Sequence, residues 1–232
     1  MIDMHTHWRP TELLDAMRKR DKEPRILKND QGVEVLRMRG APDTTLDQAF
    51  DTVGFHLGKM QRQGVTTSVL SLLGSFCWIE SQPVEQSVPL CRLYNDAVSK
   101  LCADNEGRFL AYAATPLRDM KLAAEEFDRA MGLPGMVGIQ VPADAFATRK
   151  VAEAMRPLLA VAQRHKAIVF IHYGGLPGQA FPHLPGDIDN ARRRNGTLDM
   201  QANLSAAMVT LCMTDILDDY PDAMIHVHNL GG

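Results

Sequence analysis

AIVFIH, at residues 167–172, is a continuous apolar run that ends in a histidine. Such a run is typical of a strand in a parallel sheet, because both faces of that strand are buried. Five other short runs are also rich in β-branched or apolar residues, and longer amphipathic stretches separate them. We therefore predict six strands, at residues 1–7, 65–73, 108–114, 136–141, 167–172 and 223–228.

The stretches between the strands predict helices at residues 87–104, 120–131, 149–165 and 200–218. Strands that alternate with helices form a parallel sheet, either an open doubly wound sheet or a (β/α)₈ barrel. No GxGxxG follows the first strand and no GxxxxGK[ST] occurs, so the nucleotide-binding open sheets lose support.

Two further segments interrupt the alternation. We expect an inserted hairpin at about residues 24–40 and an active-site lid in the Gly- and Pro-rich loop 174–196.

Charge and cysteine usage exclude several kinds of partner. The chain has 25 basic and 28 acidic residues among 232, so its net charge of -3 provides no bulk attraction to nucleic acid or anionic membranes. The four cysteines form no CxxC pair, which fits a reducing compartment. The first residues lack a signal peptide, and no apolar run reaches the ~20 residues of a membrane span. We predict one cytoplasmic domain over residues 1–232.

Histidines stand at the ends of three predicted strands. His5 and His7 are two residues apart in the first strand, so alternation places both side chains on one face, where they can converge on a metal. Asp3 shares that face and is expected to orient a ligand. His172 closes the fifth strand, at the edge where barrel enzymes gather their catalytic groups.

The sixth strand ends in His226 and His228 and is followed by Gly231 and Gly232. Taken alone, a histidine pair at a strand end more often faces solvent than binds a metal, and His172 is as consistent with a backbone-satisfied side chain as with a ligand. For His226 and His228, a structural role for one of them is favoured over a functional role for both. The three strand ends meet only if the sheet curls around a common centre, which favours a barrel over an open sheet. Zinc is the divalent metal that we expect, and imidazole ligands also suit iron, manganese or cobalt.

Several motifs together carry a family resemblance. They are DxHxH at residues 3–7, Asn-Asp at 95–96, Arg-Phe at 108–109, Thr-Pro-Leu at 115–117, GMVGIQ at 135–140, Phe-Ile-His at 170–172 and Tyr-Pro-Asp at 220–222. The sequence resembles the amidohydrolase-related branch of metal-dependent TIM-barrel enzymes, which includes aminocarboxymuconate-semialdehyde decarboxylase and γ-resorcylate decarboxylase. The resemblance spans the whole chain and implies a (β/α)₈ barrel.

The resemblance also implies roles for single residues. His5, His7 and His172 match metal ligands, and His228 matches a catalytic histidine. Arg37 matches an arginine that binds a substrate carboxylate, a role that suits the guanidinium fork. A solvated charge on the hairpin is an equally good interpretation of Arg37.

The sequence departs from the family pattern in two places. Asn229 occupies the register of the family's histidine, so the assignment to His228 needs a one-residue shift. The family's further aspartate, after the eighth strand, is not in the sequence, which stops at Gly232 after about six βα units. We therefore expect an incomplete barrel, and a fragment, an interrupted reading frame or completion by an oligomer all remain open. Exposed strand edges favour a homo-oligomer.

A metal held by three histidines activates water or polarises a bound oxygen. The sequence thus predicts a metal-dependent non-oxidative decarboxylase, or a related hydrolase, acting on a small unsaturated or aromatic carboxylic acid. One alternative is a catalytically impaired, truncated barrel that binds metal or serves only in an oligomer. A metal-dependent phosphoesterase or nuclease is less well supported, because carboxylate ligands for a second metal are not evident at the strand ends.

Overall fold

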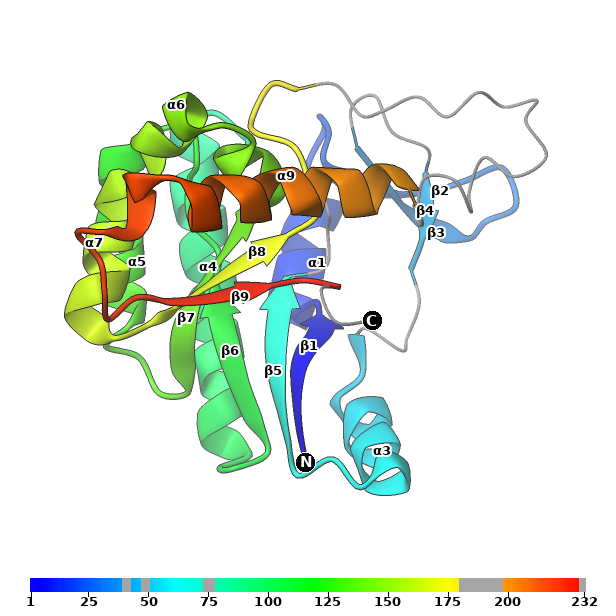
Figure 1. Ribbon diagram of the computed structural model, residues 1–232. Coiled ribbons are helices and arrows are strands. Elements are labelled where there is room, and N and C mark those ends of the chain that lie inside the picture. Colours follow the sequence, from blue (N-terminus) through cyan, green and yellow to red (C-terminus); the bar gives the residue numbers. More distant parts are fainter. Residues whose placement is uncertain (39–42, 47–50, 73–77, 180–197, 230–232) are drawn as a thin grey trace.

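A parallel sheet of six strands forms the centre of the molecule (Figure 1). The computed structural model describes residues 1–38, 43–46, 51–72, 78–179 and 198–229. The strand order in the sheet is β1-β5-β6-β7-β8-β9. All six predicted strands are confirmed near their predicted bounds: β1 (Ile2–Trp8), β5 (Thr67–Leu72), β6 (Phe109–Ala113), β7 (Met136–Pro142), β8 (Ile168–His172) and β9 (Met224–Val227).

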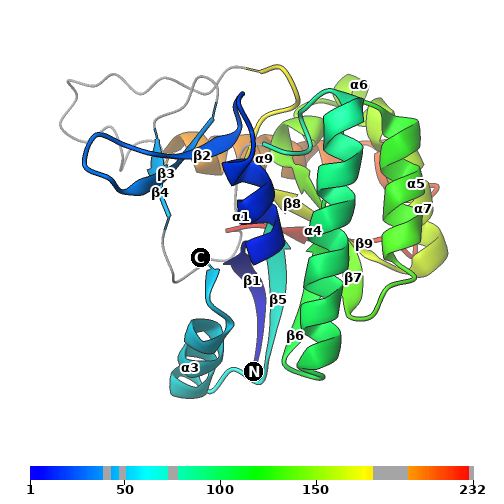
Figure 2. The same cartoon turned by 180° about the vertical axis from the view of Figure 1, so that it is seen from behind.

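Helices α4 (Val84–Asp104), α5 (Met120–Ala130) and α7 (Arg156–His165) cover one side of the sheet, as Figure 2 shows. The predicted helix at 149–165 is divided into α6 (Arg149–Ala152), a 3₁₀ turn η2 (Glu153–Met155) and α7. Pro157 explains the division, because proline lacks an amide hydrogen and fits only the first turn of a helix. The predicted helix at 200–218 likewise becomes α9 (Met200–Met213) and the 3₁₀ turn η4 (Asp215–Leu217).

Within the described residues, two α-helices were not predicted, namely α1 (Thr11–Arg18) and α3 (Val53–Gln63). A 3₁₀ turn, η1 (Ala143–Phe146), follows β7 and packs against α9. No helix in the described ranges combines the length and the apolar character that a membrane span needs.

The middle strands β5 to β8 are mostly buried on both faces. On the outer side, residues such as Ile139 and Val169 join the large core that the helices cover. On the inner side, Val69, Tyr112 and Phe170 form a second cluster, in which the Tyr112 and Phe170 rings stack with centroids 4.7 Å apart. The apolar run at 167–172 therefore forms a strand with two buried faces, as predicted.

The sheet curls strongly. His5 lies on β1 and His228 follows β9, and these strands are the two edges of the sheet, yet the two rings have centroids 4.5 Å apart. In a flat sheet, five strand spacings of about 4.8 Å would separate the edges by roughly 24 Å. The curvature confirms the barrel-type fold, with the six strands forming part of a barrel.

The insertion is a small antiparallel sheet. β2 (Arg25–Lys28) and β3 (Glu34–Arg37) pair around a turn in which the Asn29 side chain accepts hydrogen bonds from the backbone of Gln31 and Val33. The predicted hairpin is confirmed. The prediction lacked one strand, because β4 (Thr44–Thr45) pairs with β3 as a third strand. Residues 39–40 of the predicted hairpin and 180–196 of the predicted lid lie outside the described residues.

The Asn95 side chain connects three elements. Its amide donates to the backbone oxygen of Ala114 and to Glu126, and its oxygen accepts from the backbone N–H of Ala114. These bonds join α4, the end of β6 and α5. The Asn-Asp motif therefore contributes to the framework that holds the strand ends in place.

Candidate metal centre

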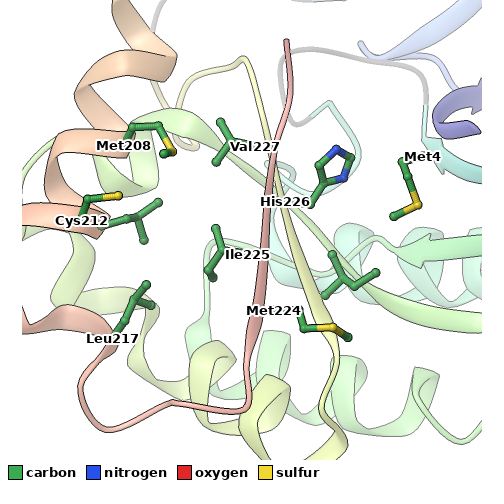
Figure 3. Close-up of a pocket in the computed structure, with 10 residues that line it drawn as sticks. Met4, Met208, Cys212, Leu217, Met224, Ile225, His226 and Val227 are labelled. Atoms are coloured by element: carbon green, nitrogen blue, oxygen red, sulfur yellow. The ribbon is translucent and has the colours of Figure 1, made fainter. Parts of the chain in front are cut away.

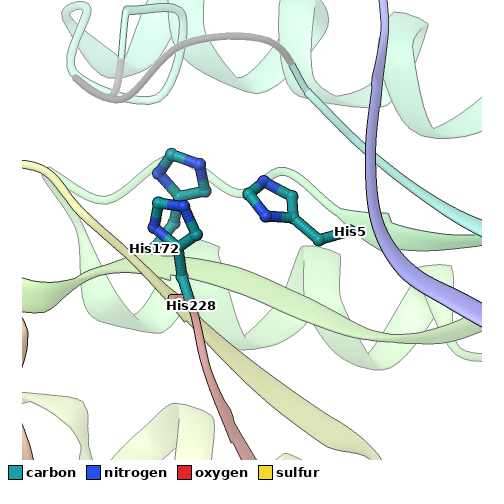
Figure 4. Close-up of side chains that lie close together, drawn as sticks. All are labelled: His5, His172 and His228. Carbon is teal, nitrogen blue, oxygen red and sulfur yellow. The ribbon is translucent and has the colours of Figure 1, made fainter. Parts of the chain in front are cut away.

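Four histidines meet at the carboxyl ends of β1, β8 and β9 (Figure 4 shows three of them). The Nε2 atoms of His5 and His7 are 3.0 Å apart, so both side chains lie on one side of β1 as strand alternation predicts. His172 and His228 stack with centroids 4.3 Å apart and an interplanar angle of 10°. One nitrogen from each of His5, His172 and His228 lies within 4.8 Å of the others.

Asp3 shapes the backbone of β1 next to the two histidines. Its carboxylate accepts hydrogen bonds from the backbone N–H of His5 at 3.1 Å and from the Thr6 hydroxyl at 2.6 Å. The pairing of β1 with β5 shifts its register between Asp3 and Thr6. We expected Asp3 to orient a ligand, and its carboxylate holds the irregular strand from which the imidazoles project.

Burial keeps the four rings uncharged. It lowers the pKa of His5, His7 and His172 to about 3, and repulsion between neighbouring histidines acts in the same direction. Burial lowers the pKa of His228 to about 4, and repulsion from His226 contributes a smaller part of this shift. At neutral pH each ring is a neutral imidazole with one lone pair, which is the form that ligates a metal.

The backbone of Tyr173 determines which nitrogen of His172 carries the proton. The carbonyl oxygen of Tyr173 is 2.8 Å from Nδ1 of His172. A carbonyl only accepts hydrogen bonds, so Nδ1 carries the proton and Nε2 carries the lone pair. That Nε2 is buried and has no hydrogen-bond partner among the described residues. A buried acceptor without a partner is unfavourable, and a bound cation would satisfy it.

The backbone of Tyr173 places the ring proton of His228 on the other nitrogen, Nε2. The backbone N–H of Tyr173 donates to Nδ1 of His228 at 3.4 Å. This Nδ1 is therefore an acceptor, and the neutral ring carries its proton on Nε2. Two stacked rings thus differ in tautomer: His172 presents a lone pair at Nε2, and His228 presents a proton.

His226 and Asn229 lie outside this arrangement. The His226 ring stacks on Phe170 with centroids 4.7 Å apart, and its Nδ1 is 3.2 Å from the Tyr112 hydroxyl. It borders a mostly apolar cavity of about 520 Å³ that β1, β9 and α9 also line (Figure 3). Asn229 is exposed, has a positive φ of 56° and donates to the sulfur of Met200. The structure therefore brings His228 into the cluster, and not Asn229.

Arg37 is at the end of β3, in the inserted sheet. Its guanidinium forms a two-point ion pair with Asp43, with distances of 2.9 and 2.7 Å. About a third of each side chain is exposed. The structure shows an ion pair within the insertion at this position, and substrate binding by Arg37 stays a prediction.

Sequence reasoning missed three contacts, one made by Ser71 and two made by the backbone of Tyr173. Ser71 Oγ is 2.9 Å from Nδ1 of His7, and the backbone of Tyr173 contacts both stacked rings. A serine within the apolar run 65–73 is a signal that sequence analysis can use. The contacts of Tyr173 involve backbone atoms, which the residue type does not reveal.

The donor set fits a divalent metal. The ligand atoms are neutral imidazole nitrogens on well-packed strands, and one of them is buried without a partner. A curled parallel sheet that gathers histidines at its strand ends defines the class of metal-dependent barrel proteins. The chain belongs to the amidohydrolase family, which matches residues 79–229.

Known proteins support this assignment. γ-Resorcylate decarboxylase from Rhizobium sp. (strain MTP-10005) is 35% identical over 89 residues, which are 35% of this chain and 25% of that protein. The apo structure of Metarhizium anisopliae IDCase matches 97% of this chain and 64% of its own, with a TM-score of 0.74 and 16% identity.

A third similar structure contains ligands. It is 5-carboxyvanillate decarboxylase from Novosphingobium aromaticivorans in complex with manganese and 4-hydroxy-3-methoxy-5-nitrobenzoic acid. It matches 97% of this chain and 64% of its own, with a TM-score of 0.66 and 16% identity. The chain therefore matches a quarter of the length of the curated relative and about two thirds of the length of the two structures.

Proposed function

We propose that this chain carries the metal centre of a decarboxylase for a small aromatic carboxylic acid. The observation that carries the proposal is the convergence of four neutral histidines, two of which hold opposite tautomers. The activity of the curated relative, which is a γ-resorcylate decarboxylase, supports the same substrate class.

His5, His7 and His172 would hold one divalent metal through their Nε2 atoms. When bound, the metal supplies Lewis-acid polarisation of a substrate oxygen. Imidazole ligands suit zinc, whereas the related 5-carboxyvanillate decarboxylase was solved with manganese. Both metals therefore belong in the first assays.

His228 would supply the proton that decarboxylation requires. In this reaction the bond between the ring carbon and the carboxyl carbon breaks, CO₂ leaves, and the ring carbon gains a proton. The backbone N–H of Tyr173 occupies Nδ1 of His228, so the transferable proton is on Nε2. The His228 pKa of about 4 leaves the ring neutral near pH 7, so His228 would have to take up a proton from solvent before it protonates the ring carbon.

The first experiment measures metal content and turnover together. The purified 232-residue protein is loaded with Zn²⁺ or Mn²⁺, analysed for bound metal and assayed for CO₂ release from γ-resorcylate. We expect about one equivalent of metal in the wild type and none in the His5→Ala/His7→Ala variant. His165→Ala is the matched control, because His165 pairs with Asp128 away from the cluster.

His228→Ala separates binding from catalysis. We expect this variant to retain its metal and to lose about 100-fold or more in turnover, as is typical when a general acid is removed. Absence of metal from the wild type would overturn the proposal. Bound metal without turnover of aromatic acids would favour the catalytically impaired barrel. The homo-oligomer and the cytoplasmic location stay predictions.

A further inference from the structure

We propose that Ser71 is a positioning residue that sets the tautomer of His7. The buried hydroxyl of Ser71 would hold the His7 proton on Nδ1, so that Nε2 keeps its lone pair at the centre of the cluster. That a metal binds this lone pair rests on the proposed function. The position of the His7 proton does not depend on it.

The register of the sheet places the two side chains together. Ser71 on β5 pairs with His7 on β1, and Ser71 is fully buried. Its Oγ is 2.9 Å from Nδ1 of His7. The same Oγ donates to the backbone carbonyl of Thr6 at 3.4 Å.

The direction of the Ser71–His7 hydrogen bond follows from proton counting. A serine hydroxyl has one proton and two lone pairs. The Thr6 carbonyl, 3.4 Å away, can accept that proton, and the oxygen then offers a lone pair to Nδ1, which donates. The backbone hydrogen bonds of the His7 ring with Leu72 and Ser71 favour the same direction, because a backbone carbonyl can only accept. A neutral His7 ring with its proton on Nδ1 has its lone pair on Nε2, 3.0 Å from Nε2 of His5.

The reverse direction would disable the cluster. If Ser71 donated to Nδ1, the neutral ring would carry its proton on Nε2. That proton would point at His5 and form an N–H···N hydrogen bond over the observed 3.0 Å. One ligand position would be lost, so the Thr6 carbonyl indirectly keeps His7 ready to bind.

His172 shows the same principle with a different partner. Its Nδ1 proton is held by a backbone carbonyl, which no substitution removes. The His7 ring also has hydrogen bonds with the backbone of Leu72 and Ser71, and the Ser71 hydroxyl is the partner that a substitution can remove. Partners that fix ligand tautomers typically change metal affinity by about 10- to 100-fold when they are removed. Ser71 is therefore the place where this principle can be tested.

The experiment reads the tautomer and the metal affinity separately. Imidazole ¹⁵N spectra of the metal-free, full-length chain at pH 7.5 report which nitrogen of His7 is protonated. We expect Nδ1–H in the wild type, transfer of the proton toward Nε2 in Ser71→Ala, and the wild-type pattern in Ser71→Thr, which keeps the hydroxyl. Competition titrations with Zn²⁺ should show about 10- to 100-fold weaker binding for Ser71→Ala alone.

Ser68→Ala is the matched control. Ser68 is a buried serine on the same strand, and alternation turns it to the opposite face. We expect it to leave the spectrum and the affinity unchanged. A wild-type ring protonated on Nε2, or an unchanged tautomer in Ser71→Ala, would overturn the inference. A wild type with the expected tautomer but without metal affinity would instead count against the proposed function.

Discussion

The middle and the edges of the six-stranded sheet have different tasks. Strands β5 to β8 are mostly buried and pack against the helical core, and they contribute one histidine to the cluster, His172. The edge strands β1 and β9 are partly exposed, and they or the residue after them provide His5, His7 and His228. The middle of the sheet thus supplies rigidity, and the curl brings the chemistry of the two edges together.

A pair of core substitutions measures this difference directly. Ile139 on β7 and Ile225 on β9 flank Val169 in one row of the sheet. Ile139 is fully buried and Ile225 is only partly buried. We expect Ile139→Ala to lower the free energy of unfolding by about 3 kcal/mol and Ile225→Ala by about 1 kcal/mol, because the edge leaves a smaller cavity. Urea unfolding checks both, and equal losses would show that the edge is packed as tightly as the middle.

Acid should destabilise the protein through its buried histidines. The pKa of His172 is about 3 in the folded state and 6.5 in the reference state. Between these values the unfolded chain binds a proton that the folded chain does not, so stability falls as the pH drops below about 6.5. At pH 5 this amounts to about 2 kcal/mol for His172.

His172→Gln tests this contribution, because glutamine does not titrate. The free energy of unfolding is measured in urea at pH 7.5 and at pH 5. We expect the loss between the two pH values to shrink by about 2 kcal/mol in the variant. The same loss in both proteins would mean that His172 is already protonated in the folded state.

Much of the fold could be predicted from the sequence because apolar periodicity and strand-end histidines are local signals. The run at 167–172 became a doubly buried strand, and the 3–7 motif placed His5 and His7 on one face. Pro157 marks the division of the helix in the sequence itself, because proline fits only the first turn of a helix. The third strand of the insertion was not predictable, because Thr44 and Thr45 form no pattern before β3 is in place.

The proton positions at the site were beyond sequence reasoning. They depend on whether a carbonyl, an N–H or a hydroxyl faces each Nδ1, which only the folded chain determines. The same residue types with a rotated Tyr173 backbone would reverse the roles of His172 and His228. Residue identity therefore predicts that the histidines lie close together, and the folded structure determines which nitrogen of each ring carries the proton.

Substitution of Arg37 should have the smallest effect on stability. It tests whether substrate binding involves the insertion as well as the sheet edges. Its ion pair with Asp43 is largely solvent-accessible, so Arg37→Ala and Asp43→Ala should both change stability very little. The two interpretations differ in the KM for an aromatic acid. If Arg37 binds the substrate carboxylate, Arg37→Ala raises KM, whereas Asp43→Ala frees the guanidinium and leaves or lowers it. If Arg37 serves only the insertion, both variants keep the wild-type KM, and binding then depends on groups at the barrel itself.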